Sequence, residues 1–344
     1  ELPSLNEITT AILEEDPAWQ AECVMLLRAA GHLTDWLAAD DDHLVPAVGE
    51  TAPAPTASAV FSPALLEHFH CAAPEAESRI ACIVALMREA IRAWPVGQPL
   101  RILQLGIAAG GLTRALEPVL AEAGNQATRA RLVVADTDES WVSRLATLYT
   151  RSPGIEVVHV DATLDALTPL GPFDIVVSAG GLHGLENIAL LCANLGGHLA
   201  DGALAFIAEI VPSAFHDVVF AGTQGWFDAV LVDGVPRGRL RDRERWTALL
   251  ATGGLVAADA ESPRAALPGG SLILATHPAA EAQTRTTAID EQDATSSEGA
   301  PAEPALVLGP TTGFGHTLAK TLHDALCARG RPAALDLSPA VYRG

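Results

Sequence analysis

A histidine and a glutamate each follow an apolar segment of the kind that forms a buried strand. His183 comes after FDIVVSAGG, and Glu209 ends ALAFIAEI. If these segments are neighbouring parallel strands, both side chains lie above the carboxyl ends of the strands, where open α/β sheets carry their clefts. A carboxylate that holds an imidazole in one tautomer makes it a competent general base. A lone histidine after a strand is more often structural, but the paired glutamate favours a catalytic role for His183 and Glu209.

A glycine-containing loop follows an earlier strand-like segment, RILQLG. Gly106, Ala108 and Gly110 give the spacing G-x-A-x-G just before a helical pattern. Such loops let a nucleotide approach the backbone and place an anion at a helix N-terminus. The spacing is nearer to G-x-G-x-G than to the G-x-G-x-x-G of dinucleotide enzymes, although Ala108 adds a methyl group where a ligand would lie closest. A turn without a ligand is an equally good interpretation of the loop alone.

Carboxylates end the next two strand-like segments. Asp136 ends RLVVAD, with Asp138 as its nearby competitor, and Asp161 ends IEVVHVD. The first position suits the ribose hydroxyls of a nucleotide and the second suits an adenine amino group. Strand-end carboxylates are often only helix caps. The order Gly106, Asp136, Asp161 along successive strands nevertheless favours a nucleotide site.

Two other segments have residue types that could bind ligands. Glu67-His68-Phe69-His70-Cys71 contains metal-ligand types, but there is no second cluster and helical spacing would separate the histidines, so we predict no metal site. GPTTGFG, at 309–315, looks like a nucleotide loop. We expect the piece of chain around it to be too short to hold a cofactor.

The elements that must position these residues alternate between strand and helix from Leu100 onward. This rhythm predicts an α/β fold with a doubly wound, Rossmann-like, seven-stranded sheet. Before it, Asp16-Pro17 begins an amphipathic helix through Leu37, and a second helix covers 74–94. We divide the chain into a helical module (1–95), a core (96–278), a linker rich in Ala, Thr, Ser, Glu and Pro (279–303), and a strand–turn–helix piece (304–344).

Composition restricts the partners. The net charge of −21 argues against a nucleic-acid partner, because phosphate binding needs a basic surface. The five cysteines show no CxxC pair, so we expect no disulfide framework or zinc ribbon and a reducing cytoplasm. The sequence has no apolar run long enough to predict a membrane span. We expect the chain to be part of a longer polypeptide.

Four motifs, taken in order, resemble one family: RILQLGIAAGGLT, VVADTDESW, FDIVVSAGGLHGLEN and RERWTALLATGG. They are similar to the C-methyltransferase domain embedded in polyketide synthases, a class I S-adenosylmethionine-dependent methyltransferase. The resemblance covers about residues 8–278 and includes Gly225-Trp226. It implies that the N-terminal module is a lid over the substrate, and that 304–344 begins a ketoreductase-like subdomain.

The resemblance also implies a reaction. The substrate would be a β-ketoacyl chain on the phosphopantetheine arm of an acyl carrier protein, with other synthase domains as neighbours. His183 would remove the α-proton with Glu209 orienting it, and the enolate carbon would take the methyl group of S-adenosylmethionine without a metal. The cofactor would contact a set of six residues: Gln104, Gly106, Ala108, Gly110, Asp136 and Asp161.

Three positions depart from the family pattern. Gln104 stands where the family usually has an acid, Ala108 replaces a glycine, and Gly180 replaces an asparagine. Synthases also carry pseudo-methyltransferases that keep the fold as scaffolding, which is the alternative function. A stand-alone small-molecule O-methyltransferase is a third interpretation. Because the chain is acidic, docking of an acidic carrier protein would need a local basic patch, for which Arg237, Arg239, Arg241 and Arg243 are candidates.

Overall fold

A mixed sheet forms the centre of the molecule. The computed structural model describes residues 4–34, 36, 60–125, 130–223, 226–227, 230–232, 235–258, 266–267, 269–278, 305–308 and 333–336. Within these ranges, five strands run parallel in the order β3-β2-β1-β4-β5. They are β1 (Leu100–Leu105), β2 (Ala130–Asp136), β3 (Ile155–His159), β4 (Phe173–Ala179) and β5 (Leu199–Ile210).

Late strands extend the sheet beyond β5. β10 (Gly270–Thr276) pairs antiparallel with β5, and β8 (Val256–Ala257) pairs antiparallel with β10. Seven strands therefore follow one another across the sheet, and β9 (Ala266–Leu267) pairs with β10 as an eighth. The predicted fold class, with late strands at one edge, is confirmed.

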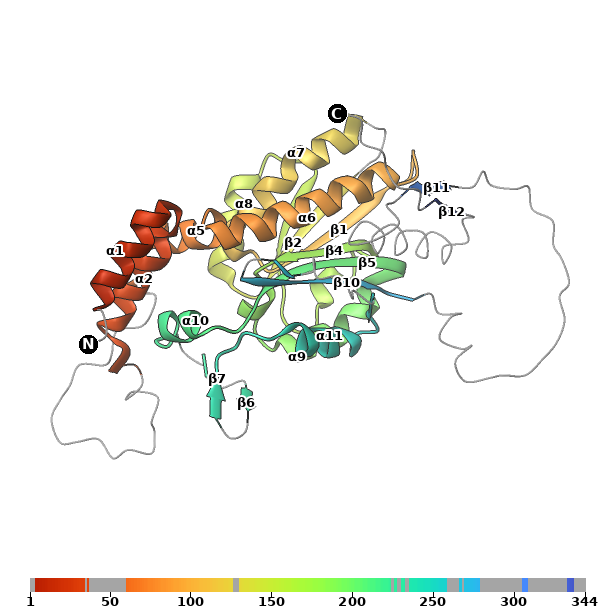
Figure 1. Cartoon of the computed structure of the whole chain (residues 1–344). Coiled ribbons are helices and arrows are strands. Elements are labelled where there is room, and N and C mark those ends of the chain that lie inside the picture. The colour runs from red at the N-terminus through yellow and green to blue at the C-terminus, as the bar shows by residue number, and fades with distance from the viewer. Residues whose placement is uncertain are drawn as a thin grey trace, which may run out of the picture.

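Helices cover both faces of the sheet (Figure 1). On one face, α6 (Pro74–Ala93), α7 (Gly111–Asn125) and α8 (Glu139–Tyr149) bury apolar side chains against residues such as Ile102 and Val134. On the other face, α9 (Ile188–Leu195) and α11 (Arg243–Ala251) pack against Leu103 and Val133. Neighbouring strand residues thus point to opposite faces, and both are buried, as expected for a parallel sheet.

The N-terminal helices form a smaller packed unit beside the sheet. Ser4 caps α1 (Leu5–Glu15) with a capping box, and Asp16 caps a short turn that leads into α2 (Gln20–Ala30). Ser62 caps α5 (Pro63–Cys71). Phe61, Phe69 and Val219 belong to the core that these helices share with α10 (Ala214–Val219). We call the unit formed by α1, α2, α5 and α10 the lid module.

Several elements differ from the sequence expectations. The helix that begins near Asp16 is interrupted after Ala30, with helical residues again at Leu33, Thr34 and Trp36, and α5 was not expected. α6 falls in the range 1–95 that the sequence assigns to the lid, but its apolar side packs on the sheet through residues such as Ile83 and Met87. The predicted linker 279–303 and the segment 309–315 lie outside the described residues.

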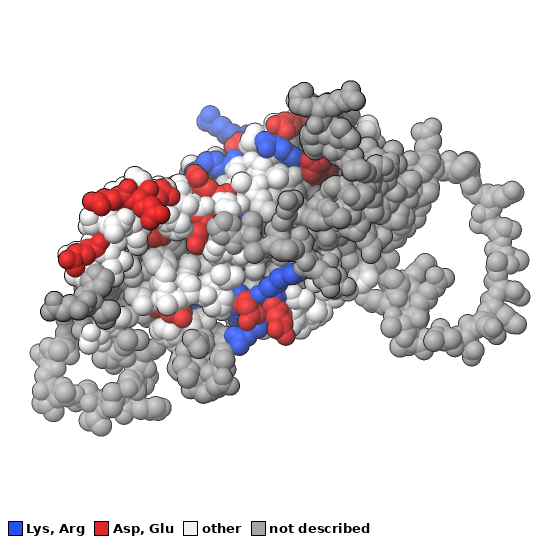
Figure 2. Space-filling view, viewed as in Figure 1, with Lys and Arg blue, Asp and Glu red and all other residues white. Residues whose placement is uncertain are grey.

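Four further strands complete the described elements. β6 (Val230–Val232) and β7 (Val235–Arg237) pair antiparallel, and β11 (Ala305–Leu308) and β12 (Ala333–Asp336) pair parallel. No helix in the described ranges has the length and apolar character needed to cross a membrane. Figure 2 shows acidic side chains gathered over the N-terminal helices, where Glu7, Glu14 and Glu15 are exposed on α1.

Candidate active site

The predicted catalytic pair is in contact. The His183 Nδ1 atom lies 3.1 Å from the Glu209 Oε2 atom. Glu209 is completely buried, and its other oxygen accepts hydrogen bonds from the Leu182 backbone N–H (2.9 Å) and the Ser178 hydroxyl (3.3 Å). All three partners can donate, which suits an ionised carboxylate. A carboxylate only accepts, so His183 carries its proton on Nδ1 and leaves Nε2 as the basic nitrogen.

A buried arginine lies close to this pair. Arg79 of α6 is 4% exposed, and its Nε and Nη1 atoms have no hydrogen-bond partner among the described residues. Its Nη1 lies 3.8 Å from Glu75 Oε2, an ion pair too long to be a hydrogen bond. Burial lowers the pKa of Arg79, and the charges of Glu209 and Glu75 partly offset that shift.

Gly180, which stands where the family pattern has an asparagine, lies against Arg79. Gly180 has φ +70°, and a Cβ atom there would lie 3.2 Å from Arg79 Nε. A side chain as large as asparagine would therefore meet the buried guanidinium. Arg79 occupies the space that a residue 180 side chain would need.

His183 opens into a cavity of about 450 Å³, a size typical of small-molecule sites. The cavity runs from the loop after β1 and the end of β2 to the lid module. Its lining residues are Phe61, Leu66, His70, Ala108, Ala109, Asp136, Asp138, Trp141, Gly180, Gly181, His183, Gly184, Phe220, Gly222, Thr223, Trp226 and Arg239. Of the six predicted cofactor residues, the cavity joins Ala108 and Asp136 to the predicted base, together with the competitor Asp138, and the other four do not line it.

Buried contacts of Gln104 and Gly106 fix the shape of the loop after β1. Gln104 is fully buried; its Nε2 donates to the Gly106 carbonyl (3.1 Å), and its Oε1 accepts from the Thr113 hydroxyl (2.9 Å). A Cβ on Gly106 would lie 2.5 Å from the backbone of Gly181, so the loops after β1 and β4 touch through their backbones. Gln104 and Gly106 shape the loop, while Ala108 faces the cavity.

Two alanines keep the backbone shape of a glycine loop. Ala108 has φ +42° and Ala109 has φ +62°, between Gly106 at +79° and Gly110 at +82°. Non-glycine residues rarely adopt these values because Cβ crowds the backbone. The turn therefore retains a conformation suited to glycine, at a steric cost, and the helix α7 begins directly after it.

The strand-end carboxylates differ in position. Asp136 lines the cavity, and its oxygens accept from the backbone N–H groups of Ile107 (2.6 Å) and Asp138 (2.9 Å). Burial raises its pKa, with those hydrogen bonds acting in the opposite direction. Asp138 also lines the cavity and caps α8. The competitor Asp138 is therefore as well placed as Asp136.

Asp161 is not brought to the cavity. β3 ends at His159, so Asp161 lies beyond the strand, where its side chain is exposed. Its carboxylate accepts from the Thr163 hydroxyl (2.6 Å) and backbone N–H (2.9 Å), which lowers its pKa. Asp161 therefore stabilises the turn before the short helix Asp165–Leu167, whose N-cap residue is Leu164, so the side chain neither lines the cavity nor caps a helix.

Sequence reasoning missed part of the cavity. Trp141 on α8 and His70 on α5 line it, as do Phe220 and Trp226 from the segment after β5. The pattern Ser62-Pro63, which repeats the cap and proline of Asp16-Pro17, could have revealed α5. Which residues of α5 face the cavity depends on tertiary packing.

The segment 67–71 lies at the end of α5 and attaches it to the core. Glu67 forms ion pairs with Arg144 of α8 (2.7 Å) and Arg114 of α7 (3.4 Å). The Cys71 thiol lies 3.8 Å and 3.6 Å from the carbonyl oxygens of Ala108 and Ala109. In the described ranges no group of three ligand-type residues is arranged to hold a metal.

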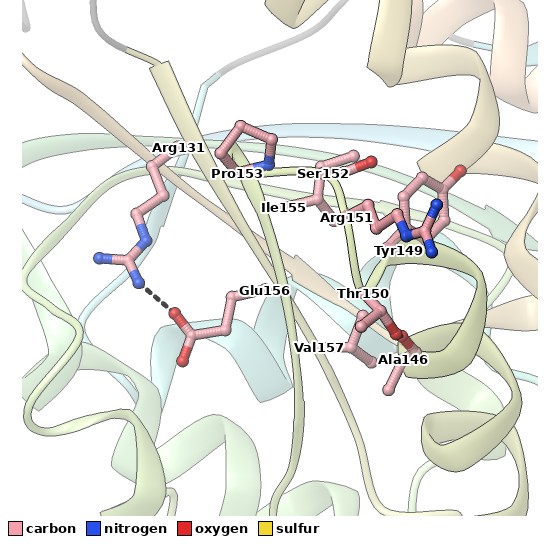
Figure 3. A pocket seen from close by; sticks show the side chains of 10 residues that line it. All are labelled: Arg131, Ala146, Tyr149, Thr150, Arg151, Ser152, Pro153, Ile155, Glu156 and Val157. Atoms are coloured by element: carbon pink, nitrogen blue, oxygen red, sulfur yellow. Dashed lines mark hydrogen bonds and ion pairs between the residues drawn. The ribbon is translucent and has the colours of Figure 1, made fainter.

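A second hollow lies at the other end of the sheet. It has a volume of about 410 Å³ near the starts of β2 and β3 (Figure 3). Arg131 and Glu156 form an ion pair on one side of the view, and Arg151 and Tyr149 lie together on the other side. None of the predicted site residues lines it, so the chemistry belongs to the cavity at His183.

The fold has relatives among solved structures. The CurJ carbon methyltransferase superposes with a TM-score of 0.62 at 18% identity, over 81% of this chain and 72% of that one. The CMeT domain of the citrinin polyketide synthase superposes with a TM-score of 0.64 at 17% identity, over 81% and 70%. The trans-methyltransferase CalH, solved with SAH, gives a TM-score of 0.54 at 19% identity, over 79% and 72%. The chain therefore has the class I S-adenosylmethionine-dependent methyltransferase fold. The form of that fold is the one found in the carbon-methyltransferase domains of polyketide synthases.

Sequence comparison gives relatives that match only part of the chain. No family model matches the chain. The polyketide methyltransferase ustM of Ustilaginoidea virens is 27% identical over 170 residues, which is 47% of this chain and 38% of that protein. The non-reducing polyketide synthase mapC of Penicillium roqueforti (strain FM164) is 26% identical over 134 residues, which is 38% of this chain and 5% of that protein. The chain thus spans well under half the length of either relative.

Proposed function

We propose that this chain is an S-adenosylmethionine-dependent C-methyltransferase domain of a polyketide synthase. It methylates the α-carbon of a β-ketoacyl chain carried by an acyl carrier protein. The observation that carries the proposal is the His183–Glu209 pair, which opens into the cavity that Ala108, Asp136 and Asp138 also line. A base beside a cavity large enough for a nucleotide could remove a proton from a substrate that lies next to a bound methyl donor.

The residues around the loop fit the cofactor. Asp136 and Asp138 would accept hydrogen bonds from the ribose hydroxyls, and the indole of Trp141 offers a face for the adenine. The backbone of Ala108 and Ala109, at the start of α7, would receive the methionine carboxylate. When bound, S-adenosylmethionine supplies an electrophilic methyl group on its sulfonium sulfur. Gln104 and Gly106 support the loop without contacting the ligand.

His183 would move the proton. Its Nε2 would accept the α-proton, and the imidazolium that results would be stabilised by the Glu209 carboxylate at Nδ1. Because Glu209 is already held by Leu182 and Ser178, it does not need to reorient during the step.

The lid module would keep water from the reacting carbon. Phe61, Leu66, Phe220 and Trp226 give the cavity an apolar wall on the lid side. An apolar wall that excludes water strengthens the interaction between the imidazolium and its carboxylate. It also protects an electron-rich carbon from protonation by water. A flexible acyl chain would lie along these side chains.

The arginines proposed for carrier docking are not equivalent. Arg239 lines the cavity, and Arg243 begins α11. Arg241 lies over the Trp246 ring (5.2 Å to the centroid) and donates to the Arg239 carbonyl (3.0 Å), so its charge is already engaged. The Arg237 side chain lies outside the described residues. Because Arg239 lines the cavity, we assign docking of the acidic carrier to Arg239.

Calorimetric titration with S-adenosylmethionine tests the cofactor part of the proposal. We expect saturable heat from the wild-type chain and weaker binding from Asp138→Ala. Glu186→Gln, an exposed position beyond the cavity, serves as the control and should bind like wild type. Absence of heat at millimolar ligand would instead support the alternative, an inactive domain that retains the fold as scaffolding.

A further inference from the structure

One histidine of the cavity has no part in the reaction as proposed. His70 lies near the end of α5 and lines the same cavity as His183. Its ring stacks on Phe220, with centroids 6.5 Å apart and planes at 25°, and it meets the neighbouring Phe69 ring edge-on at 5.2 Å. Among the described residues, none forms a hydrogen bond with its ring nitrogens. The aromatic contacts therefore fix the ring while its polar atoms remain available.

The helix that carries His70 is attached on both sides of it. Glu67 pairs with Arg114 and Arg144 of the core helices, and the thiol of Cys71 meets the carbonyls of the cofactor loop. These contacts hold the end of α5 that carries His70 against the loop after β1. The position of His70 relative to His183 is therefore set by the packed core and does not depend on a free loop.

His70 is neutral. Burial lowers its pKa to about 3, and the charges of His183 and Arg79 act in the same direction. A neutral imidazole has one N–H donor and one acceptor nitrogen. It would not compete with His183 for the substrate proton, but it can donate a hydrogen bond to an oxygen that gains negative charge.

The proposed reaction creates such an oxygen. Removing the α-proton of a β-ketoacyl thioester places negative charge on a carbonyl oxygen, and donors aimed at that position lower the barrier. Asp136 and Asp138 would repel it, and the Trp226 indole N–H already donates to Asp217 (3.1 Å). Thr223 and Arg239 also line the cavity, and His70 is the neutral ring donor that α5 contributes to it.

We infer that His70 donates its ring N–H to the enolate oxygen of the acyl substrate while His183 removes the α-proton. The proton passes from the α-carbon to His183 Nε2. The electron pair of the C–H bond becomes the carbon–carbon π bond, and the carbonyl π pair moves onto the oxygen, while His70 keeps its own proton. This role rests on the proposed function and adds a residue that neither the motifs nor the fold assigns.

Exchange of the α-protons tests this role without a methyl donor. A β-ketoacyl thioester of N-acetylcysteamine is incubated with the protein in D2O, and loss of the α-proton signal is followed by NMR above the rate without protein. We expect His70→Phe, which keeps the ring packing, to slow exchange about 100-fold. His70→Gln keeps an N–H donor and should regain much of the rate. His68→Gln, exposed on the same helix, should match wild type.

The outcomes distinguish failure of the His70 role from failure of the proposed function. An exchange rate in a folded His70→Phe variant equal to the wild-type rate would overturn the role of His70. If wild type shows neither exchange nor methyl transfer, the proposed function fails, and the inference fails with it. Should His70→Phe not fold, His70→Leu replaces it: a loss of exchange that His70→Gln recovers supports donation, and a wild-type rate in His70→Leu contradicts it.

Discussion

Ala108 keeps a left-handed backbone that glycine would adopt without a steric cost. Ala108 and Ala109 both line the cavity, so this cost is located where a ligand would approach. The sequence placed this loop correctly after the first strand and at the start of a helix. It could not show that Gln104 bonds to Thr113 or that Gly106 touches the backbone of Gly181, because these contacts depend on tertiary packing.

Ala108→Gly should relieve the strain. A non-glycine residue in this region costs roughly 1–2 kcal/mol, partly offset by the greater freedom of glycine in the unfolded chain. We expect the free energy of unfolding to rise by up to about 1 kcal/mol and S-adenosylmethionine to bind more tightly. In contrast, Ala146→Gly inside helix α8 should destabilise by about 1 kcal/mol. Urea denaturation of both variants checks the signs, and a loss of stability in Ala108→Gly would show that the loop is not strained at this position.

At the scale of elements, the site depends on two loops that meet at glycines. The loop after β1 and the loop after β4 touch at Gly106 and Gly181, which holds the cofactor loop against the loop that carries His183. The βαβ rhythm predicted these strands and their helices. It could not predict the two-residue strand β8, which has too few residues to show a pattern. It also did not predict α5, because the histidines and the cysteine in this helix were interpreted as a possible ligand motif.

Gly106→Ala should therefore damage both loops. Its Cβ would lie 2.5 Å from Gly181 and would require φ +79°, so we expect a loss of about 3 kcal/mol or more and no measurable cofactor binding. Gly184→Ala is the matched control, because a Cβ there meets no atom within 4 Å. Thermal denaturation compares the two. Equal stability of the two variants would show that the loops do not depend on this contact.

At the scale of the whole molecule, buried histidines should make stability depend on pH. Burial lowers the pKa of His216 from 6.5 to about 3, with His183 acting in the same direction. The unfolded chain therefore binds a proton between about pH 6.5 and 3 that the folded chain does not, so stability falls as the pH falls through this window. The loss is at most about 1.4 kcal/mol per pH unit for this group.

His216→Gln should weaken that dependence. Urea denaturation at pH 6.5 and pH 5 gives the change in unfolding free energy for each variant. We expect a smaller change in His216→Gln than in wild type, and a wild-type change in His68→Gln, whose side chain is exposed. The same slope in all three proteins would mean that His216 is not neutral in the folded state.

Carrier recognition is also a property of the whole surface. A chain of charge −21 repels an acidic partner at long range, so a local cation near the cavity should have a measurable effect. Arg239→Glu should raise the KM for carrier-bound substrate about three- to tenfold and change the KM for small thioesters less. Arg151→Glu, which lines the hollow near the starts of β2 and β3 (Figure 3), is the control. A similar rise in both variants would argue for a general charge effect and against docking at Arg239.

Methyl transfer to carbon should depend above all on His183, the proposed base. The direct measurement is mass spectrometry of a β-ketoacyl thioester after incubation with S-adenosylmethionine and the wild-type, His183→Ala or Glu209→Gln chain. We predict a product that gains one CH2 unit at the α-carbon with wild type, at least about 100-fold less with Glu209→Gln, and none with His183→Ala. Methylation by His183→Ala at the wild-type rate, or a wild-type chain that binds the cofactor but transfers no methyl group, would contradict this role.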